Sequence, residues 1–263
     1  MNESPLPTES ETASAPVAET SLGARLFNVF VSPGEVFEEV KDGPPRAANW
    51  LVPLLLAIVV GWIGGWLVMS DPVVQQQIQD LQETALQKQA QKGGASAEQL
   101  DQQRVAAEKV GRIVREFGVW VGPVVANLVI LFWWAFLTWL LGNKALPGKF
   151  GFGKALEAGG LILMPGILHG VVVTLLILVM GTMFAGTNLA LPLARGFDQG
   201  NPLHVILGAV DVVALWILAI RAIALSRLSG ATLTRSAAWV FGLWLGWKVI
   251  TIGLSLVWMR FAG

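Results

Sequence analysis

The chain has 263 residues and no net charge; 54% of its residues are hydrophobic and only 14% are charged. Soluble domains carry about 25% charged residues, so this composition indicates a protein whose solvent is the lipid bilayer. The neutral balance gives no general attraction to nucleic acid, and the absence of Cys excludes disulfides, thiolate metal sites and cysteine nucleophiles.

The N-terminal region divides into a tail and a pair of short helices. Residues 1–21 are rich in Glu, Ser, Thr, Pro and Ala and have too little apolar surface to offset the entropy of ordering, so we expect a disordered tail. Residues 22–47 place apolar side chains on helical faces and are predicted to form amphipathic helices that lie on the membrane surface. Ordinary capped surface helices are the alternative.

A capping pattern marks the start of the second short helix. Ser32 can accept from the backbone N–H of Glu35, Glu35 can reach back to Ser32, and Pro33 occupies the first helical position. Gly43 and the two prolines after it end this helix. The residues expected to hold the two helices at the interface are Phe27, Phe30, Ser32, Pro33, Glu35 and Phe37.

Five apolar runs are each long enough to cross a bilayer. A span needs about 20 residues, because each residue advances about 1.5 Å along a helix and the hydrocarbon core is about 30 Å thick. The predicted spans are residues 50–69, 118–141, 159–184, 204–225 and 237–258. The expected fold class is therefore all-α, a polytopic membrane protein with five transmembrane helices in a membrane domain that covers residues 48–261.

Residues 73–117 form a polar, Gln-rich insertion between the first two spans. We expect an extramembrane, antiparallel helical hairpin, whose second helix begins at a capping box of Ser96 and Gln99. The heptad seam of the first helix consists of Val74, Ile78, Leu81 and Ala85. Because this seam is short, it is expected to need a partner.

The distribution of Lys and Arg predicts the orientation of the chain. Five basic residues lie just before the third and fifth spans, against Arg195 alone between the third and fourth. This bias favours an N-terminus in the cytoplasm and a C-terminus on the outer side.

Three stretches carry a resemblance to a known family. They are L-F-N-V-F-V-S-P-G-E-V-F-E-E-V (Leu26–Val40), W-L-V-P-L-L-L (Trp50–Leu56) and the basic loop K-A-L-P-G-K-F-G-F-G-K-A-L (Lys144–Leu156). Together with the five spans, they make the chain similar to the Yip family (Ypt-interacting or Yip-one-domain membrane proteins), bacterial type. The resemblance extends from about Leu22 to Phe261.

The resemblance implies a five-span protein with a cytoplasmic N-terminus, here in the inner (plasma) membrane of a bacterium. Eukaryotic members are tied to Rab-type GTPases and vesicle traffic, and they carry motifs that contain Tyr. This chain has no Tyr, so no GTPase-binding residue is transferred to it. The expected partners are the lipid bilayer and another membrane or peripheral protein, or a second copy of the chain.

Several polar side chains lie inside the predicted spans, where a charge costs about 2.5–3.5 kcal/mol on insertion scales. Arg221 is about one turn from the end of its span and is expected to snorkel to the interface. Asp211 and Lys248 lie at depths that differ by roughly 5 Å, so a structural salt bridge between them is predicted. The full set is Asp211, Lys248, Arg221, His169 and Asn127, of which His169 is expected to bond a neighbouring helix or a carbonyl freed by Pro165.

No catalytic, metal or cofactor motif is complete in the sequence. Gly148 to Lys154 matches G-x-x-x-x-G-K, but Ala155 stands at the magnesium-binding position and no strand precedes the loop. We therefore predict no enzyme activity, no metal and no cofactor, and a non-enzymatic role in protein interaction, membrane organisation or traffic-like partner binding. The alternatives are a channel or transporter lined by Asp211, Lys248 and His169, and a structural subunit of a larger complex.

Overall fold

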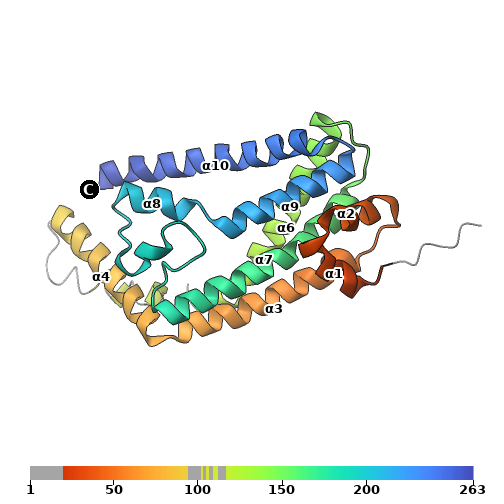
Figure 1. The fold of residues 1–263 in the computed structure, drawn as a ribbon. Coiled ribbons are helices and arrows are strands. Elements are labelled where there is room, and N and C mark those ends of the chain that lie inside the picture. The colour runs from red at the N-terminus through yellow and green to blue at the C-terminus, as the bar shows by residue number, and fades with distance from the viewer. Residues whose placement is uncertain (1–19, 94–101, 103–104, 107–108, 112–116, 263) are drawn as a thin grey trace, which may run out of the picture.

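The computed structural model describes residues 20–93, 102, 105–106, 109–111 and 117–262, and they form a helical bundle (Figure 1). Five helices are long and apolar enough to cross a membrane: Ala48–Ser70, Gly122–Ala145, Phe152–Met180, Val212–Ser229 and Leu233–Val257. The only β-structure in these described residues is an isolated bridge between Asn188 and Asp211. The predicted fold class, all-α with five membrane-spanning helices, is confirmed.

The elements follow one another along the chain with short connections. Helices α1 (Leu22–Val31) and α2 (Pro33–Asp42) precede α3 (Ala48–Ser70), and α4 (Pro72–Gly93) follows it directly. Helix α6 (Gly122–Leu140) continues into a π-helical turn (Leu141–Ala145), and α7 (Phe152–Met180) comes next. A 3-10 turn (Leu191–Gly196) and α8 (Pro202–Ala209) lead to α9 (Val212–Ser229) and α10 (Leu233–Ala262).

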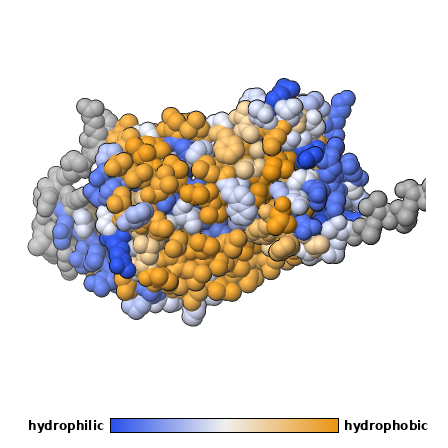
Figure 2. All heavy atoms as spheres, viewed as in Figure 1, coloured by the Kyte–Doolittle hydropathy of each residue, from blue (hydrophilic) through white to orange (hydrophobic). Residues whose placement is uncertain are grey.

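The long helices lie side by side, with α1 and α2 at one end of the bundle and α4 and α8 at the other (Figure 1). In Figure 2, apolar residues form a broad band across the middle, and hydrophilic residues gather at both ends. Large apolar side chains on the outer faces are exposed, among them Val129 at 60% and Trp247 and Leu254 at 66%. Exposed apolar belts of this kind suit helices whose outer faces contact lipid.

Helix α7 contacts α3, α6 and α9 and so forms the centre of the bundle. It approaches α3 closely at Gly160, where a Cβ atom would overlap the Cα of Trp50 and lie 2.7 Å from the carbonyl oxygen of Asn49. Main-chain atoms cannot turn aside as a flexible side chain can, so only glycine fits here. This close contact sets the first turns of α3 against α7, which is where the polar site described below lies.

The fourth spanning helix starts later than predicted. The run 204–225 is not one helix: α8 ends at Ala209, the backbone is extended at Val210 and Asp211, and α9 begins at Val212. Asp211 is the N-cap of α9, and its Oδ1 accepts from the backbone N–H of Ala214 at 2.8 Å. Aspartate is a favoured N-cap residue, and its capping bond stabilises a fresh helix start inside an otherwise apolar run. Helix α7 also differs, since it begins at Phe152 rather than at residue 159.

The predicted hairpin and tail fall partly on described residues. Helix α4 covers the predicted first arm, and a Cβ atom on Gly111 would lie 3.3 Å from Nε2 of Gln82, so Gly111 of the predicted second arm lies beside α4. The capping box at Ser96 and Gln99 and the tail up to residue 19 lie outside the described residues. Ser21, which was expected to belong to the tail, caps α1 instead, because its Oγ accepts from the N–H of Ala24 at 3.2 Å.

Candidate functional site

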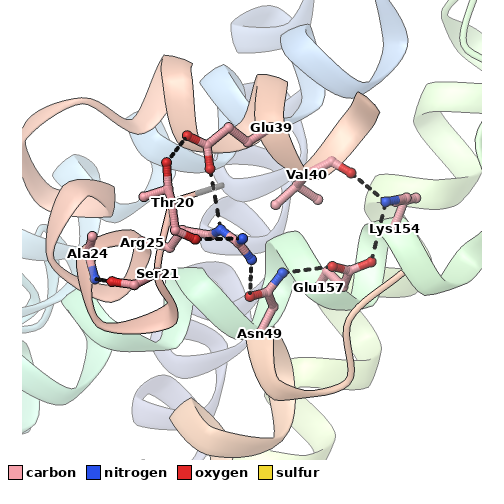
Figure 3. Close-up of polar contacts among 9 residues, drawn as sticks. All are labelled: Thr20, Ser21, Ala24, Arg25, Glu39, Val40, Asn49, Lys154 and Glu157. Atoms are coloured by element: carbon pink, nitrogen blue, oxygen red, sulfur yellow. Dashed lines mark hydrogen bonds and ion pairs between the residues drawn. The ribbon is translucent and has the colours of Figure 1, made fainter. Parts of the chain in front are cut away.

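A buried polar network joins the N-terminal helices to the spanning helices (Figure 3). Arg25 from α1 meets Asn49 at the start of α3, and Asn49 in turn meets Glu157 in the second turn of α7. These three residues are 5%, 1% and 2% exposed, respectively. Polar and charged groups buried to this extent are stable only where the fold supplies their partners.

Arg25 bonds three separate segments of the chain. Its Nη1 donates to Oδ1 of Asn49 at 3.1 Å, its Nη2 to the carbonyl of Thr20 at 2.7 Å, and its Nε to Oε2 of Glu39 at 3.3 Å. The planar guanidinium presents its donors in a fixed fork, which suits it to hold several acceptors at set angles. One side chain therefore ties α1 to α2 and to α3.

Lys154, in the first turn of α7, caps the C-terminal end of α2. Its Nζ donates to the carbonyls of Val40 and Gly43, at 2.6 Å each. The last carbonyls of a helix have no partner inside the helix and carry partial negative charge, so a cation is stabilising there. The position of α2 is thus fixed at its end as well as along its face.

Glu157 is the buried acid of this network. Its Oε2 accepts from Nδ2 of Asn49 at 2.8 Å. Its Oε1 lies 3.6 Å from Nζ of Lys154, which is an ion pair but too long for a hydrogen bond, and Oε1 has no hydrogen-bond partner. A buried acceptor without a donor costs about 1–3 kcal/mol, and more when it is charged.

A cavity of about 680 Å³ opens beside the network, between α1, α2 and the loop that precedes α3. Its lining is unbalanced in charge, because it contains more carboxylates than cationic groups. The carboxylates are Glu35, Glu38, Glu39, Asp42 and Glu157, and the cationic groups are Arg25 and Arg46. The volume lies within the range of about 300–1,000 Å³ that is usual for small-ligand sites.

The apolar faces of α1 and α2 are turned toward the protein. Val29 of α1 and Phe37 of α2 are fully buried in a cluster that includes Leu161 of α7 and Ile220 of α9. Of the aromatic residues predicted at the membrane interface, Phe37 is therefore a core residue, while Phe27 is 67% exposed. Phe30 lies between these extremes and packs beside Trp216, with 6.0 Å between ring centroids.

The capping box predicted at Ser32 is wrong. The Ser32 side chain makes no capping hydrogen bond, and it is the Ser32 carbonyl that accepts from the N–H of Glu35, at 3.1 Å. Ser32 also ends α1 by donating its own N–H to the carbonyl of Asn28 at 2.7 Å, so it serves two helices and departs from ordinary N-cap geometry. Pro33 does occupy the first helical position, as predicted.

Asp211 pairs with His169 rather than with Lys248. Nε2 of His169 lies 3.1 Å from Oδ2 of Asp211, and the hydroxyl of Thr187 donates to the same oxygen at 2.7 Å. Among the described side chains, Lys248 has no ion pair. The predicted Asp211–Lys248 bridge is wrong because the break before α9 makes Asp211 an N-cap directed toward α7. Of the two partners expected for His169, a neighbouring helix and a carbonyl freed by Pro165, it contacts the first, through Asp211 at the N-cap of α9.

Two further polar residues predicted inside the spans, Arg221 and Asn127, make contacts within the protein. Arg221 is 7% exposed, with its Cζ 4.4 Å from the ring centroid of Trp134, so it does not snorkel as predicted. A guanidinium stacked on an indole face gains a cation–π attraction that is strongest away from water. Asn127 donates its Nδ2 to the carbonyl of Pro123 at 2.8 Å, a bond within its own helix.

Sequence patterns alone miss the network at the N-terminal end of the bundle. Arg25, Asn49 and Glu157 lie outside the unbroken apolar runs, where polar residues are usually solvated. A partial signal was present, because Asn49 directly precedes one such run and Glu157 closely precedes another. Their pairing, however, joins positions 108 residues apart and follows only from the packing of α3 on α7.

The family model of the Yip1 domain matches residues 27–257, which is most of the chain. Comparisons with curated proteins and with solved structures give no match. The matched range includes α2, Asn49 and Glu157 of the buried network, and all five candidate spanning helices. The chain therefore belongs to the Yip1-domain family.

Proposed function

We propose that this Yip1-domain protein is a non-enzymatic membrane interaction protein that binds a helical partner through its hairpin. In this proposal it resides in a bacterial inner membrane with its N-terminus in the cytoplasm, so the hairpin faces the outer side. One observation carries the proposal: an exposed apolar seam rises from a base that is firmly attached to the bundle.

The base of the hairpin is held by specific contacts. Val74 of α4 is fully buried. Oε1 of Gln77 accepts from the N–H of Met183 at 2.9 Å, and Nε2 of the same side chain donates to Oγ1 of Thr182 at 3.2 Å. Asp71 caps α4, since its Oδ1 accepts from the N–H groups of Val73 and Val74. These bonds fix the direction in which α4 leaves the bundle.

Above this base, several apolar residues of the hairpin are exposed, while Ile78 is partly buried. Leu81 on the first arm is 39% exposed, and Val105 and Val110 on the second arm are 63% and 59% exposed. Solvated helices normally place such residues against a core, so their exposure on a polar, Gln-rich hairpin favours a docking role. The spacing of Ile78, Leu81 and Ala85 suits a facing α-helix that has its own apolar seam. The neighbouring Gln residues are neutral, so the partner helix needs no particular charge.

The polar residues inside the bundle support interaction rather than transport. Asp211, His169 and Thr187 satisfy one another, and Arg221 is stacked on Trp134. A solute path lined by Asp211, His169 and Lys248 would need these groups to share one space, and Lys248 makes no bond to the other two in the described part of the chain.

Site-specific photo-cross-linking in native membranes tests this proposal. A photoreactive amino acid at Leu81 should form one defined protein adduct, whereas the same group at Glu83, on the opposite face of α4, should not. Introducing Ala85→Asp one turn above should abolish the adduct, because a charge in an apolar seam is not tolerated. The matched change Gln79→Asp, on the outer face, should leave it intact.

The result can also contradict the proposal. Equal labelling from Leu81 and Glu83, or an adduct that survives Ala85→Asp, would show that the seam does not dock a partner helix. An adduct with a second copy of the chain would identify the partner as the protein itself, which is a form of the same interaction.

A further inference from the structure

We propose that α10 is a docking surface for a spanning helix of a different membrane protein, a helix that carries an Asp or Glu near the middle of the bilayer to pair with Lys248. The surface uses no residue of the hairpin, so this inference is independent of the partner docking proposed above. Two observations carry it: a lysine without a partner at mid-depth, and a polar stripe that continues from it along the same helix face.

Helix α10 lies at the edge of the bundle, where it packs on α9 and α8 (Figure 1). It is the least buried of the five candidate spans. Val240 and Trp244 attach its first half to the bundle, because they share an apolar cluster with Leu218 of α9. Lys248 follows one turn after Trp244 on the same face and is partly buried. No described residue of α10 after Trp244 belongs to that cluster, so the apolar attachment ends just before the lysine.

Lys248 is too deep to reach the membrane surface. It is about nine residues, or about 13 Å, from the nearer end of the apolar stretch Leu233–Val257. The alkyl stem of a lysine is shorter than this distance, so its ammonium group cannot snorkel to the interface. Its Nζ makes no hydrogen bond and no ion pair with any described residue. Charged side chains inside spans normally pair with another group, so this lysine calls for an anion.

The acids of the chain itself are already committed. Glu157 is the one acid inside the five candidate spans, and it is bonded to Asn49 at the α1–α2 end of the bundle. Asp211 directly precedes the fourth span, where its two oxygens are bonded to His169, Thr187 and the backbone of Ala214. A second copy of the chain would present the same committed acids. The carboxylate must therefore come from a different protein.

Depth selects a protein helix over a lipid as the source of the anion. Lipid phosphates lie outside a hydrocarbon core that is about 30 Å thick, so they do not reach a cation in its middle. A side chain on a spanning helix can be placed at any depth, because each residue advances about 1.5 Å along the axis. An acid near the centre of such a helix lies level with Lys248, and the pair removes two isolated charges from the lipid.

The face of Lys248 continues as a polar stripe of Thr251 and Ser255, which follow it by three and seven residues. Their hydroxyls donate to the carbonyls of Lys248 and Thr251, at 3.2 Å and 2.9 Å. Each hydroxyl oxygen keeps lone pairs that can accept from a facing helix. Hydroxyl side chains of this kind hydrogen-bond between helices in membranes, so the stripe suits a partner that is polar along one face.

The first test uses the purified full-length protein in phosphatidylcholine liposomes with synthetic spanning peptides of Leu and Ala. One peptide carries Glu at its centre, a second carries Gln there, and a third carries Glu two turns nearer its end. Energy transfer to a fluorophore on Thr234→Cys measures association, since the chain has no other Cys. We expect the central-Glu peptide to bind about tenfold more tightly than the other two.

Variants assign this preference to the lysine. Lys248→Met should abolish it, and Lys248→Arg should keep it because the charge remains. Lys248→Glu should instead prefer a peptide with Lys at its centre. The matched control is Arg235→Met, an exposed cation at the other end of the same helix, which should leave the preference unchanged. Without peptide, Lys248→Met should unfold at the same or a higher temperature than the unaltered protein, because it removes a charge that has no partner within the chain.

The second test uses native membranes. A photoreactive amino acid at Thr251 should form an adduct with another membrane protein that is lost in Lys248→Met and kept in Lys248→Arg. Replacing the acid in the partner's span by Leu should remove the same adduct. The adduct formed from Leu81 of the hairpin should not change in Lys248→Met, so failure of one docking proposal is distinguishable from failure of the other.

Other results would overturn the inference. These are equal binding of the Glu and Gln peptides, a preference that survives Lys248→Met, or a lower unfolding temperature for Lys248→Met, which would show a partner within the chain. A Thr251 adduct with a second copy of the chain, or with lipid alone, would exclude a different protein as the occupant. Rapid reaction of Lys248→Cys with a membrane-impermeant maleimide in the liposomes would show that water, not a carboxylate, solvates this position.

Discussion

The side-chain amide of Asn49 donates to Oε2 of Glu157 at 2.8 Å, and this bond joins the first turn of α3 to α7 across 108 residues. Asn49 also accepts from Arg25, so it stands between a buried cation and a buried anion. It carries no charge itself, yet each ion depends on it for a hydrogen bond. The junction between the N-terminal helices and the bundle therefore rests on an uncharged residue.

Replacing Asn49 with Ala should destabilise the protein strongly. The change leaves Nη1 of Arg25 and Oε2 of Glu157 without their partners in a site that water barely reaches, at a cost of about 3 kcal/mol. Thermal unfolding in detergent measures the effect. The control is Asn127→Ala, which removes only a bond within α6 and should cost about 1 kcal/mol. Similar losses for both variants would contradict the central place given to Asn49.

The sequence predicts the spanning helices well because span length and apolar composition are local properties. The break at Asp211 is less visible, since a single capping residue inside an apolar run changes the mean hydropathy little. The network of Arg25, Asn49 and Glu157 could not be predicted, because its bonds depend on which helices pack together. The burial of Arg221 depends likewise on Trp134, which belongs to a different helix.

Double-mutant cycles should separate the true partner of Asp211 from the one that helix depth suggests. The cycle Asp211→Asn with His169→Gln should give a coupling energy of about 0.5–3 kcal/mol, because the two side chains are in contact. The cycle Asp211→Asn with Lys248→Met should give a coupling near zero. Unfolding free energies of the single and double variants provide both values. A large coupling with Lys248 would mean that the helices rearrange in the membrane.

The orientation of the chain can be measured without background, because the sequence contains no Cys. Asp42→Cys, at the end of α2, should react with a membrane-impermeant maleimide only after the cells are permeabilised. Gln79→Cys, on α4 at the opposite end of the bundle, should react in intact cells (Figure 1). The reverse pattern would place the N-terminus outside, and labelling of both sites from one side would contradict five spans.

Gly160→Ala should disrupt the packing of α3 on α7. The added methyl group would overlap the Cα of Trp50, and neither backbone can yield without moving a whole helix. The expected loss is about 1–3 kcal/mol of unfolding free energy, the usual cost of overpacking. Gly166→Ala on the same helix is the matched control, because a Cβ atom there meets nothing within 4 Å. Since both changes replace Gly by Ala within α7, their helix propensities cancel, and the difference in unfolding temperature reports only the contact with α3.

Because that contact also holds Asn49 against Glu157, Gly160→Ala should weaken the attachment of α1 and α2, seen as faster hydrogen exchange in residues 22–42. Equal exchange in both variants would show that the network holds the N-terminal helices without help from this close approach.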